Sequence, residues 1–149
     1  MIEYEAGKLR HVEHGCVMLG SGDMPGRLAT LLRELTLRFE QHQPDCVAVE
    51  SVFMAKNASS AFKLGQARGV ALCAAATAGL AVAEYTPASV KQAIVGRGRA
   101  DKQQMQHMIR LLLGLREKVQ EDAADALGVA ICHAHSDRTG QVIARAAAT

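Results

Sequence analysis

The chain has 149 residues, of which 49% are hydrophobic, and a formal net charge of +2, so we expect one domain, residues 1–149, with a packed core. Its four cysteines lie far apart and form no C-x-x-C pair, which argues against a disulfide framework or a zinc site. No secretory signal is present and the longest apolar stretch, residues 69–83, is too short to span a bilayer, so we expect a cytoplasmic protein without a membrane partner.

The N-terminal third predicts a hairpin followed by an amphipathic helix. Residues 2–4 and 9–19 are typical of two strands around an EAGK turn. Pro25 suits the first turn of a helix, and the residues that follow place apolar side chains on one face: Leu28, Leu31, Leu32, Leu35 and Phe39.

Strands and helices then alternate along the chain. Residues 46–49 (CVAV) and 80–85 (LAVAEY) predict buried strands on either side of an alanine-rich helix at about 58–78. Further helices are expected from Pro87 to about 95, from the Asp101 capping box to about 113, and from about 122 to 133. His133 and His135 would then lie near a helix C-terminus, where histidine has a structural reason to occur. This order predicts an α/β fold whose mixed sheet has parallel strands in the middle and a hairpin at one side.

Glu50 follows the apolar strand 46–49 directly. A carboxylate at such a position is costly unless something compensates its charge. Two interpretations stay open: the strand ends at Val49 and Glu50 faces water, or Glu50 belongs to a site at the end of the strand.

Asp122 and Asp125 are three residues apart in EDAADAL and would share one face of a helix. They could cap the helix and complement its dipole. They could also converge with Glu50, and three converging carboxylates would repel one another unless a divalent cation lay between them.

Basic residues are concentrated in the middle of the chain. Residues 51–118 hold ten Lys or Arg and three acids, a net charge of +7 against +2 for the whole chain. Such a segment suits a polyanion such as nucleic acid, and it equally suits a solvated lysine-rich surface.

Three blocks of this sequence resemble those of the RuvC-type Holliday-junction resolvases. They are VAVESVFMAKNASSAFKLGQARGVA, YTPASVKQAIVGRGRADKQQMQHMI and DAADALGVAICHAH, which occur in this order within residues 12–135. The resemblance implies a ribonuclease H-like fold and a homodimer that cuts four-way DNA junctions in recombination and repair by paired symmetric nicks. It also implies Mg²⁺ as cofactor, two ions per subunit with Mn²⁺ as a substitute, and a branch-migration helicase complex as partner.

The resemblance also assigns roles to individual residues. Glu50, Asp122 and Asp125 match the family's metal ligands and catalytic carboxylates. Phe53 matches an aromatic side chain near the junction centre, where stacking on bases tolerates any sequence. The predicted DNA-binding set is Phe53, Lys56, Lys91, Arg97, Arg99 and Lys102. For the glycine loop GRGR, which carries Arg97 and Arg99, an exposed turn without a DNA contact is an equally good interpretation.

One family motif has no counterpart in this sequence. Members of the family begin with an apolar strand carrying Ile-Asp-Pro-Gly, whose aspartate is the first metal ligand, whereas this sequence starts at MIEYEAGKLR. We expect the first, central strand to be missing, through a start codon assigned too late or a truncation. The alternatives to a resolvase are a non-catalytic junction-binding module and, less well supported by VFMAKN and KLGQARG, a ribonuclease H-like nuclease with another substrate.

Overall fold

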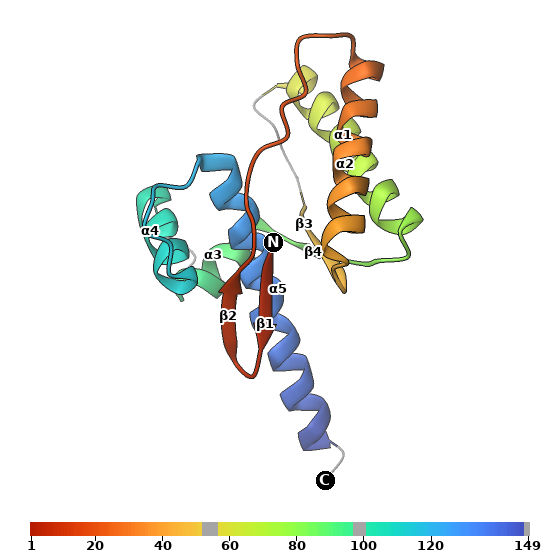
Figure 1. Ribbon diagram of the computed structural model, residues 1–149. Coiled ribbons are helices and arrows are strands. Elements are labelled where there is room, and N and C mark those ends of the chain that lie inside the picture. Colours follow the sequence, from red (N-terminus) through yellow and green to blue (C-terminus); the bar gives the residue numbers. More distant parts are fainter. Residues whose placement is uncertain (52–56, 97–100, 148–149) are drawn as a thin grey trace. The chain divides into compact units, whose positions relative to one another are not determined.

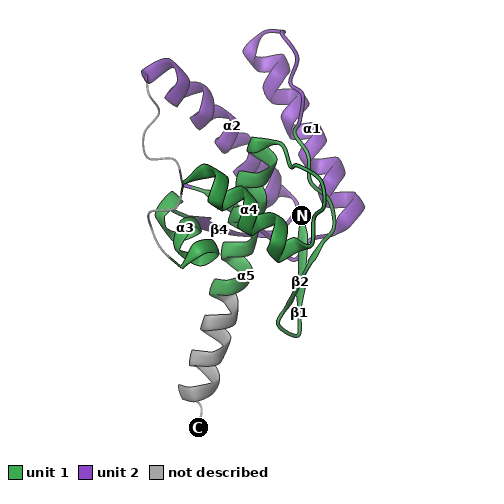
Figure 2. Cartoon of the chain, turned by 90° about the vertical axis from the view of Figure 1, so that its left-hand side faces the viewer, with its two compact units in different colours: residues 1–16, 48–50, 85–149 green, residues 17–47, 51–84 purple. Residues whose placement is uncertain are grey.

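The computed structural model describes residues 1–51, 57–96 and 101–147, with side chains up to residue 136 in the last of these ranges. Residue contacts divide the chain into two compact units, unit 1 (residues 1–16, 48–50 and 85–149) and unit 2 (residues 17–47 and 51–84), coloured separately in Figure 2. The elements drawn in Figure 1 are β1 (Ile2–Glu5), β2 (Lys8–His11), α1 (Met24–His42), β3 (Cys46–Glu50), α2 (Ala58–Thr77), β4 (Ala81–Tyr85), α3 (Pro87–Val95), α4 (Lys102–Leu113) and α5 (Glu121–Ala147).

Four helices begin at capping side chains, of which the sequence predicted the one at Asp101. Each cap accepts a hydrogen bond from a backbone N–H three residues later, which satisfies a donor that has no partner inside the helix. At α4 the capping box is complete, because Gln104 also accepts from the backbone N–H of Asp101. The four caps are Asp23 for α1, Asn57 for α2, Thr86 for α3 and Asp101 for α4.

The strands form two two-stranded sheets. β1 and β2 are antiparallel, with Ile2 opposite His11 and Glu5 opposite Lys8, and Ala6 and Gly7 turn between them at φ +50° and +82°. The predicted hairpin is therefore confirmed, but its second strand ends at His11 and not at residue 19. β3 and β4 are hydrogen-bonded neighbours in the other sheet.

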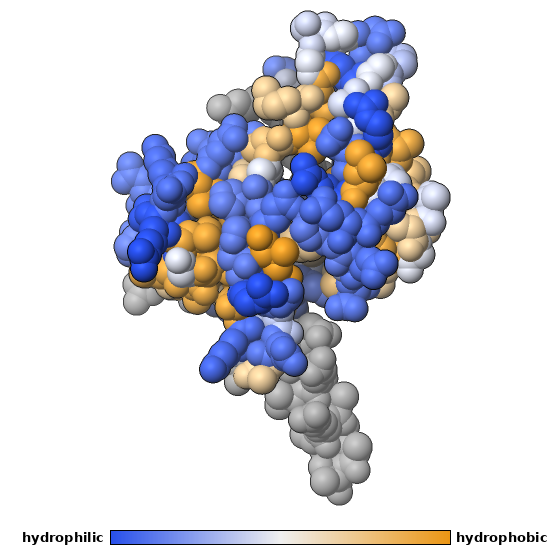
Figure 3. Space-filling model, viewed as in Figure 1, coloured by the Kyte–Doolittle hydropathy of each residue, from blue (hydrophilic) through white to orange (hydrophobic). Residues whose placement is uncertain are grey.

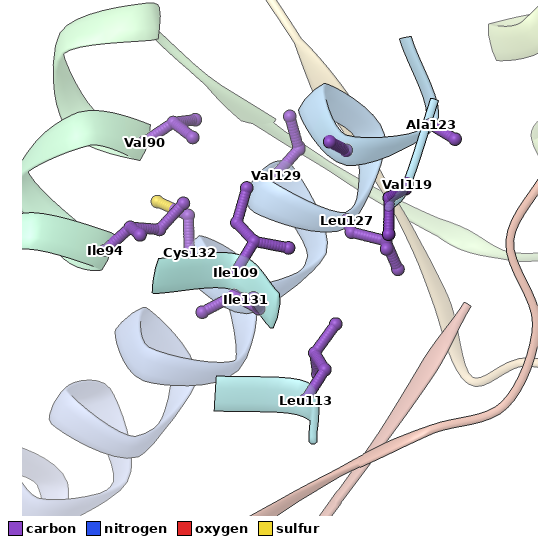
Figure 4. Close-up of a cluster of buried hydrophobic side chains, with 11 residues drawn as sticks. Val90, Ile94, Ile109, Leu113, Val119, Ala123, Leu127, Val129, Ile131 and Cys132 are labelled. Carbon is purple, nitrogen blue, oxygen red and sulfur yellow. The ribbon is translucent and has the colours of Figure 1, made fainter. Parts of the chain in front are cut away.

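The core of unit 1 forms where α3, α4 and α5 meet (Figure 4). Gly128 lets the helices approach closely, because a Cβ at this position would lie 3.1 Å from Ile94 Cδ1 and 3.3 Å from Val90 Cγ1. The core is aliphatic, as the composition predicts, and its buried members are Val90, Ile94, Ile109, Leu113, Val119, Ala123, Ala124, Leu127, Val129, Ile131 and Cys132. Ile2, Leu9 and Ala48 add partly buried side chains from the strands.

The last helix extends well beyond its predicted end. The sequence suggested a stop near His133, but α5 continues to Ala147. Residues 143–147, IARAA, include three alanines and no glycine or proline, so nothing in this stretch opposes helix formation.

Among the described residues, unit 2 buries fewer hydrophobic side chains than unit 1. In unit 2, α1 packs against α2, and the buried hydrophobic residues described there are Ala74 and Ala75. Both strands that were expected to be buried are more accessible than that: residues 46–49 of β3 are half-buried, and Ala81, Val82 and Glu84 of β4 are exposed. Apolar side chains reach the surface, some of them visible among polar ones in Figure 3. Those of unit 2 are Met18, Leu32, Leu37, Phe62, Leu64 and Val82.

Adding a branched side chain at Gly128 should destabilise unit 1. Gly128→Val places methyl groups where Ile94 and Val90 already lie, and overpacking of this kind costs about 1–3 kcal/mol. The measurement is chemical denaturation followed by circular dichroism. Gly65→Val in α2 is the matched control, because a Cβ at Gly65 meets nothing within 4 Å. Equal stability of the two variants would show that the close approach at Gly128 is unimportant.

Candidate active site

Glu50 is the last residue of β3. The strand before it is apolar and half-buried, and Ala48, two residues earlier, packs against the core of unit 1. Glu50 itself is exposed. The strand therefore carries a carboxylate from the edge of the core to the surface, a position that both interpretations of this residue share.

Asp122 and Asp125 lie on the exposed face of α5. Their orientation follows from the opposite face, where Ala123, Ala124 and Leu127 are each no more than 2% exposed in the core. Asp122 is in the first turn of α5, where an acidic side chain complements the helix dipole. Asp125 lies beyond that turn, so helix capping does not explain it.

Glu50 and Asp125 are close enough for their charges to interact. The pKa of Glu50 is raised above its ordinary value, first by burial of the carboxyl group and then by the negative charge of Asp125. Because the residue as a whole stays exposed, solvent screens this repulsion and keeps it modest. The fold thus brings two residues that are 75 positions apart in the sequence within the range of charge interaction.

Such a pair suits a hard divalent cation, which prefers carboxylate oxygens and would offset the repulsion. Asp122 shares the exposed face with Asp125 and lies three residues before it. Over residues 1–51, 57–96 and 101–136, however, no three His, Cys, Asp or Glu side chains are grouped closely enough to hold a metal ion. The donor types therefore fit a cation, with Glu50 and Asp125 as the pair that the fold brings together.

The predicted DNA-binding residues are distributed unevenly. Lys102 is exposed at the start of α4 and forms an ion pair with Glu121, the residue before Asp122. Lys91 is half-buried in α3. The other predicted members of this set, Phe53, Lys56, Arg97 and Arg99, lie outside the described residues.

Two histidines of α5 contact neighbouring elements. These contacts were not predicted from the sequence. Tyr85, at the end of β4, has its hydroxyl 2.8 Å from Nδ1 of His133, and the two rings are tilted against each other. Nδ1 of His135 lies 3.2 Å from the carbonyl oxygen of Ala93 in α3. Because α5 continues past them, the expectation that they sit at a helix end is wrong. The sequence did contain a signal for the first of these contacts: Tyr85, a polar aromatic residue, ends the apolar strand LAVAEY.

A family model described as crossover junction endodeoxyribonuclease RuvC matches residues 1–133 of the chain. The chain belongs to the RuvC family. A RuvC from Citrifermentans bemidjiense is 54% identical over 137 residues, which cover 91% of this chain and 84% of the relative. A RuvC from Marinobacter nauticus is 48% identical over 145 residues, which cover 97% of this chain and 83% of the relative.

Two solved RuvC structures from Thermus thermophilus share the fold. One, described as a complex with Holliday junction substrate, has a TM-score of 0.87 at 33% identity and covers 93% of this chain and 86% of that one. The other has a TM-score of 0.82 at 35% identity and covers 93% of this chain and 87% of that one. The expected α/β, ribonuclease H-like class is confirmed. At the level of its RuvC family, the chain is a crossover junction endodeoxyribonuclease, as the three sequence blocks predicted.

Removing the charge of Asp125 should lower the pKa of Glu50. Asp125→Asn abolishes the repulsion while burial still acts, so the pKa should fall part of the way toward its ordinary value. The measurement is a pH titration of the Glu50 carboxyl carbon by NMR without divalent cations. Asp45→Asn, the same charge change in an exposed residue before β3, is the control and should leave the Glu50 pKa unchanged. If Asp125→Asn left the pKa of Glu50 unchanged, the inferred proximity of Glu50 and Asp125 would be contradicted.

Proposed function

We propose that the protein resolves four-way DNA junctions by paired symmetric nicks, through Mg²⁺-dependent phosphodiester hydrolysis that Mn²⁺ also supports. The observation that carries this proposal is the charge interaction between Glu50 and Asp125 on the exposed side of unit 1. Membership in the RuvC family and the likeness to a junction-bound RuvC supply the substrate. A basic segment of net charge +7 adds the electrostatic attraction that a phosphate backbone needs.

Glu50, Asp122 and Asp125 would hold the cations, two per subunit. Divalent ions bound there would supply the charge that activates a water and stabilises the leaving oxygen of an in-line displacement. The protein's own contribution is positional. β3 holds Glu50 and α5 holds both aspartates, so the backbone of each carboxylate is fixed by regular secondary structure.

Basic and aromatic side chains would position the DNA. Lys91 and Lys102 would contact the phosphates near the cut, and phosphate contacts set register without reading sequence. Phe53 would stack on bases at the junction centre, with Lys56, Arg97 and Arg99 on the backbone around it.

A homodimer suits this chemistry, because two symmetric nicks require two identical sites related by a twofold axis. A branch-migration helicase complex remains the expected further partner. In the described part of the chain, no helix is sufficiently long and apolar to cross a membrane. The location that we propose is cytoplasmic.

The second candidate function is junction binding without cutting. The observation that favours it is that the described residues bring together no group of three metal-binding side chains. A site with fewer carboxylates holds divalent ions more weakly. A binding-only protein would prefer a four-way junction over a duplex and leave both uncut in Mg²⁺ and Mn²⁺.

Replacing each carboxylate by its amide separates the two functions. Glu50→Gln, Asp122→Asn and Asp125→Asn should each slow the cutting of a labelled synthetic junction by about a hundredfold or more, the scale set by loss of one charge-stabilising group. Junction affinity should persist, because it comes mainly from phosphate contacts. Asp45→Asn is the control and should cut normally. Wild-type cutting by Glu50→Gln would refute the metal-site assignment, and a wild-type protein that binds without cutting would favour the second candidate.

A further inference from the structure

A cavity lies between the start of α4 and the segment that leads into α5. Its volume is about 670 Å³. Val119, which lines part of it, is buried in the core of unit 1. The remaining lining residues all carry polar or charged groups: Lys102, Gln103, Gln106, Lys118, Gln120 and Glu121.

The lining is rich in hydrogen-bond donors. Its two lysines carry positive charge, and its three glutamines each present an amide NH₂ group. One carboxylate, that of Glu121, is the only acid in the lining. The charged and amide groups of this lining suit an anion with several oxygen atoms more than they suit a cation.

Glu121 already binds one of those donors, the ammonium group of Lys102. It forms an ion pair with Lys102, and both side chains are more than half exposed. An exposed pair contributes little to stability, so a stronger anion can displace Glu121 at small cost. The carboxylate therefore lies where an incoming phosphate oxygen would bind.

We propose that this cavity binds a phosphate of the DNA backbone and that Glu121 occupies Lys102 until DNA displaces it. The inference rests on the proposed function, which supplies DNA as the polyanion. Lys102 and Lys118 provide charge from two segments of the chain, and the glutamines provide neutral donors around it.

Glu121 also changes the ion balance of binding. In the free protein Lys102 is neutralised by Glu121, so a phosphate that takes Lys102 leaves Glu121 to acquire a cation from solution. That uptake cancels part of the counterion release that drives binding to DNA. Removing the carboxylate should therefore raise affinity and steepen its dependence on salt.

The experiment measures affinity by fluorescence anisotropy at several salt concentrations, with a labelled duplex and a labelled four-way junction, in the absence of divalent cations. Glu121→Gln should bind both DNAs more tightly, by up to about fivefold, the upper range for an exposed ion pair. Its plot of log affinity against log salt should be steeper by up to about one unit, the share of one phosphate. Lys118→Ala should bind more weakly, with a slope shallower by a similar amount.

Two matched controls isolate the cavity. Glu117→Gln makes the same charge change four residues earlier, at an exposed position outside the lining. Lys8→Ala removes an exposed lysine in the β1–β2 hairpin. Both should leave the slope close to the wild-type value.

The outcomes distinguish this inference from the proposed function. If Glu121→Gln and Glu117→Gln change binding equally, net charge explains the effect and the phosphate site is refuted, even where the junction is preferred. If Glu121→Gln acts as predicted on both DNAs but the protein does not prefer the junction, the phosphate site stands and the junction function fails. A wild-type protein that binds neither DNA would overturn both.

Discussion

The packing of α5 against α3 and α4 is the contact on which the rest of unit 1 depends. Gly128 permits it, because any side chain there would meet Ile94 and Val90. With one face of α5 buried, the opposite face must be exposed, and that face carries Asp122 and Asp125. The same contact lets His133 reach Tyr85 at the end of β4. A core made of aliphatic side chains thus determines where the charged groups lie.

Charges of both signs gather around the first turns of α5. Burial of the carboxyl group and, second, the negative charge of Asp125 raise the pKa of Glu50. Lys102 forms an ion pair with Glu121, one residue before Asp122. The positive charge of a lysine therefore lies next to this acidic segment. An arrangement of this kind is unfavourable for an isolated fold and becomes favourable when divalent ions and a phosphate backbone bind together. Stability given up locally is consistent with a functional site.

Much of the local structure could be predicted from the sequence, because its signals are local. Pro25, Pro87 and the capping box at Asp101 mark helix starts within a few residues. The end of α5 was missed, since no breaker follows His133 closely and helix ends are weakly encoded. Spacing made Asp122 and Asp125 candidates, but only the family resemblance selected them with Glu50 from among the acids. The Lys102–Glu121 pair and the Tyr85–His133 contact join segments 19 and 48 residues apart, so they depend on tertiary packing.

The account rests on Glu50, Asp122 and Asp125 acting as one cation-binding centre. The most direct test is titration of the isotopically labelled protein with Mn²⁺, whose unpaired electrons broaden NMR signals of nearby nuclei. The account predicts that signals of Glu50 and of residues 122–125 broaden first and together, at Mn²⁺ concentrations that leave Glu3 and Glu5 of the exposed β1–β2 hairpin sharp. Equal broadening at the hairpin glutamates, or broadening of Asp122 and Asp125 without Glu50, would contradict a shared centre.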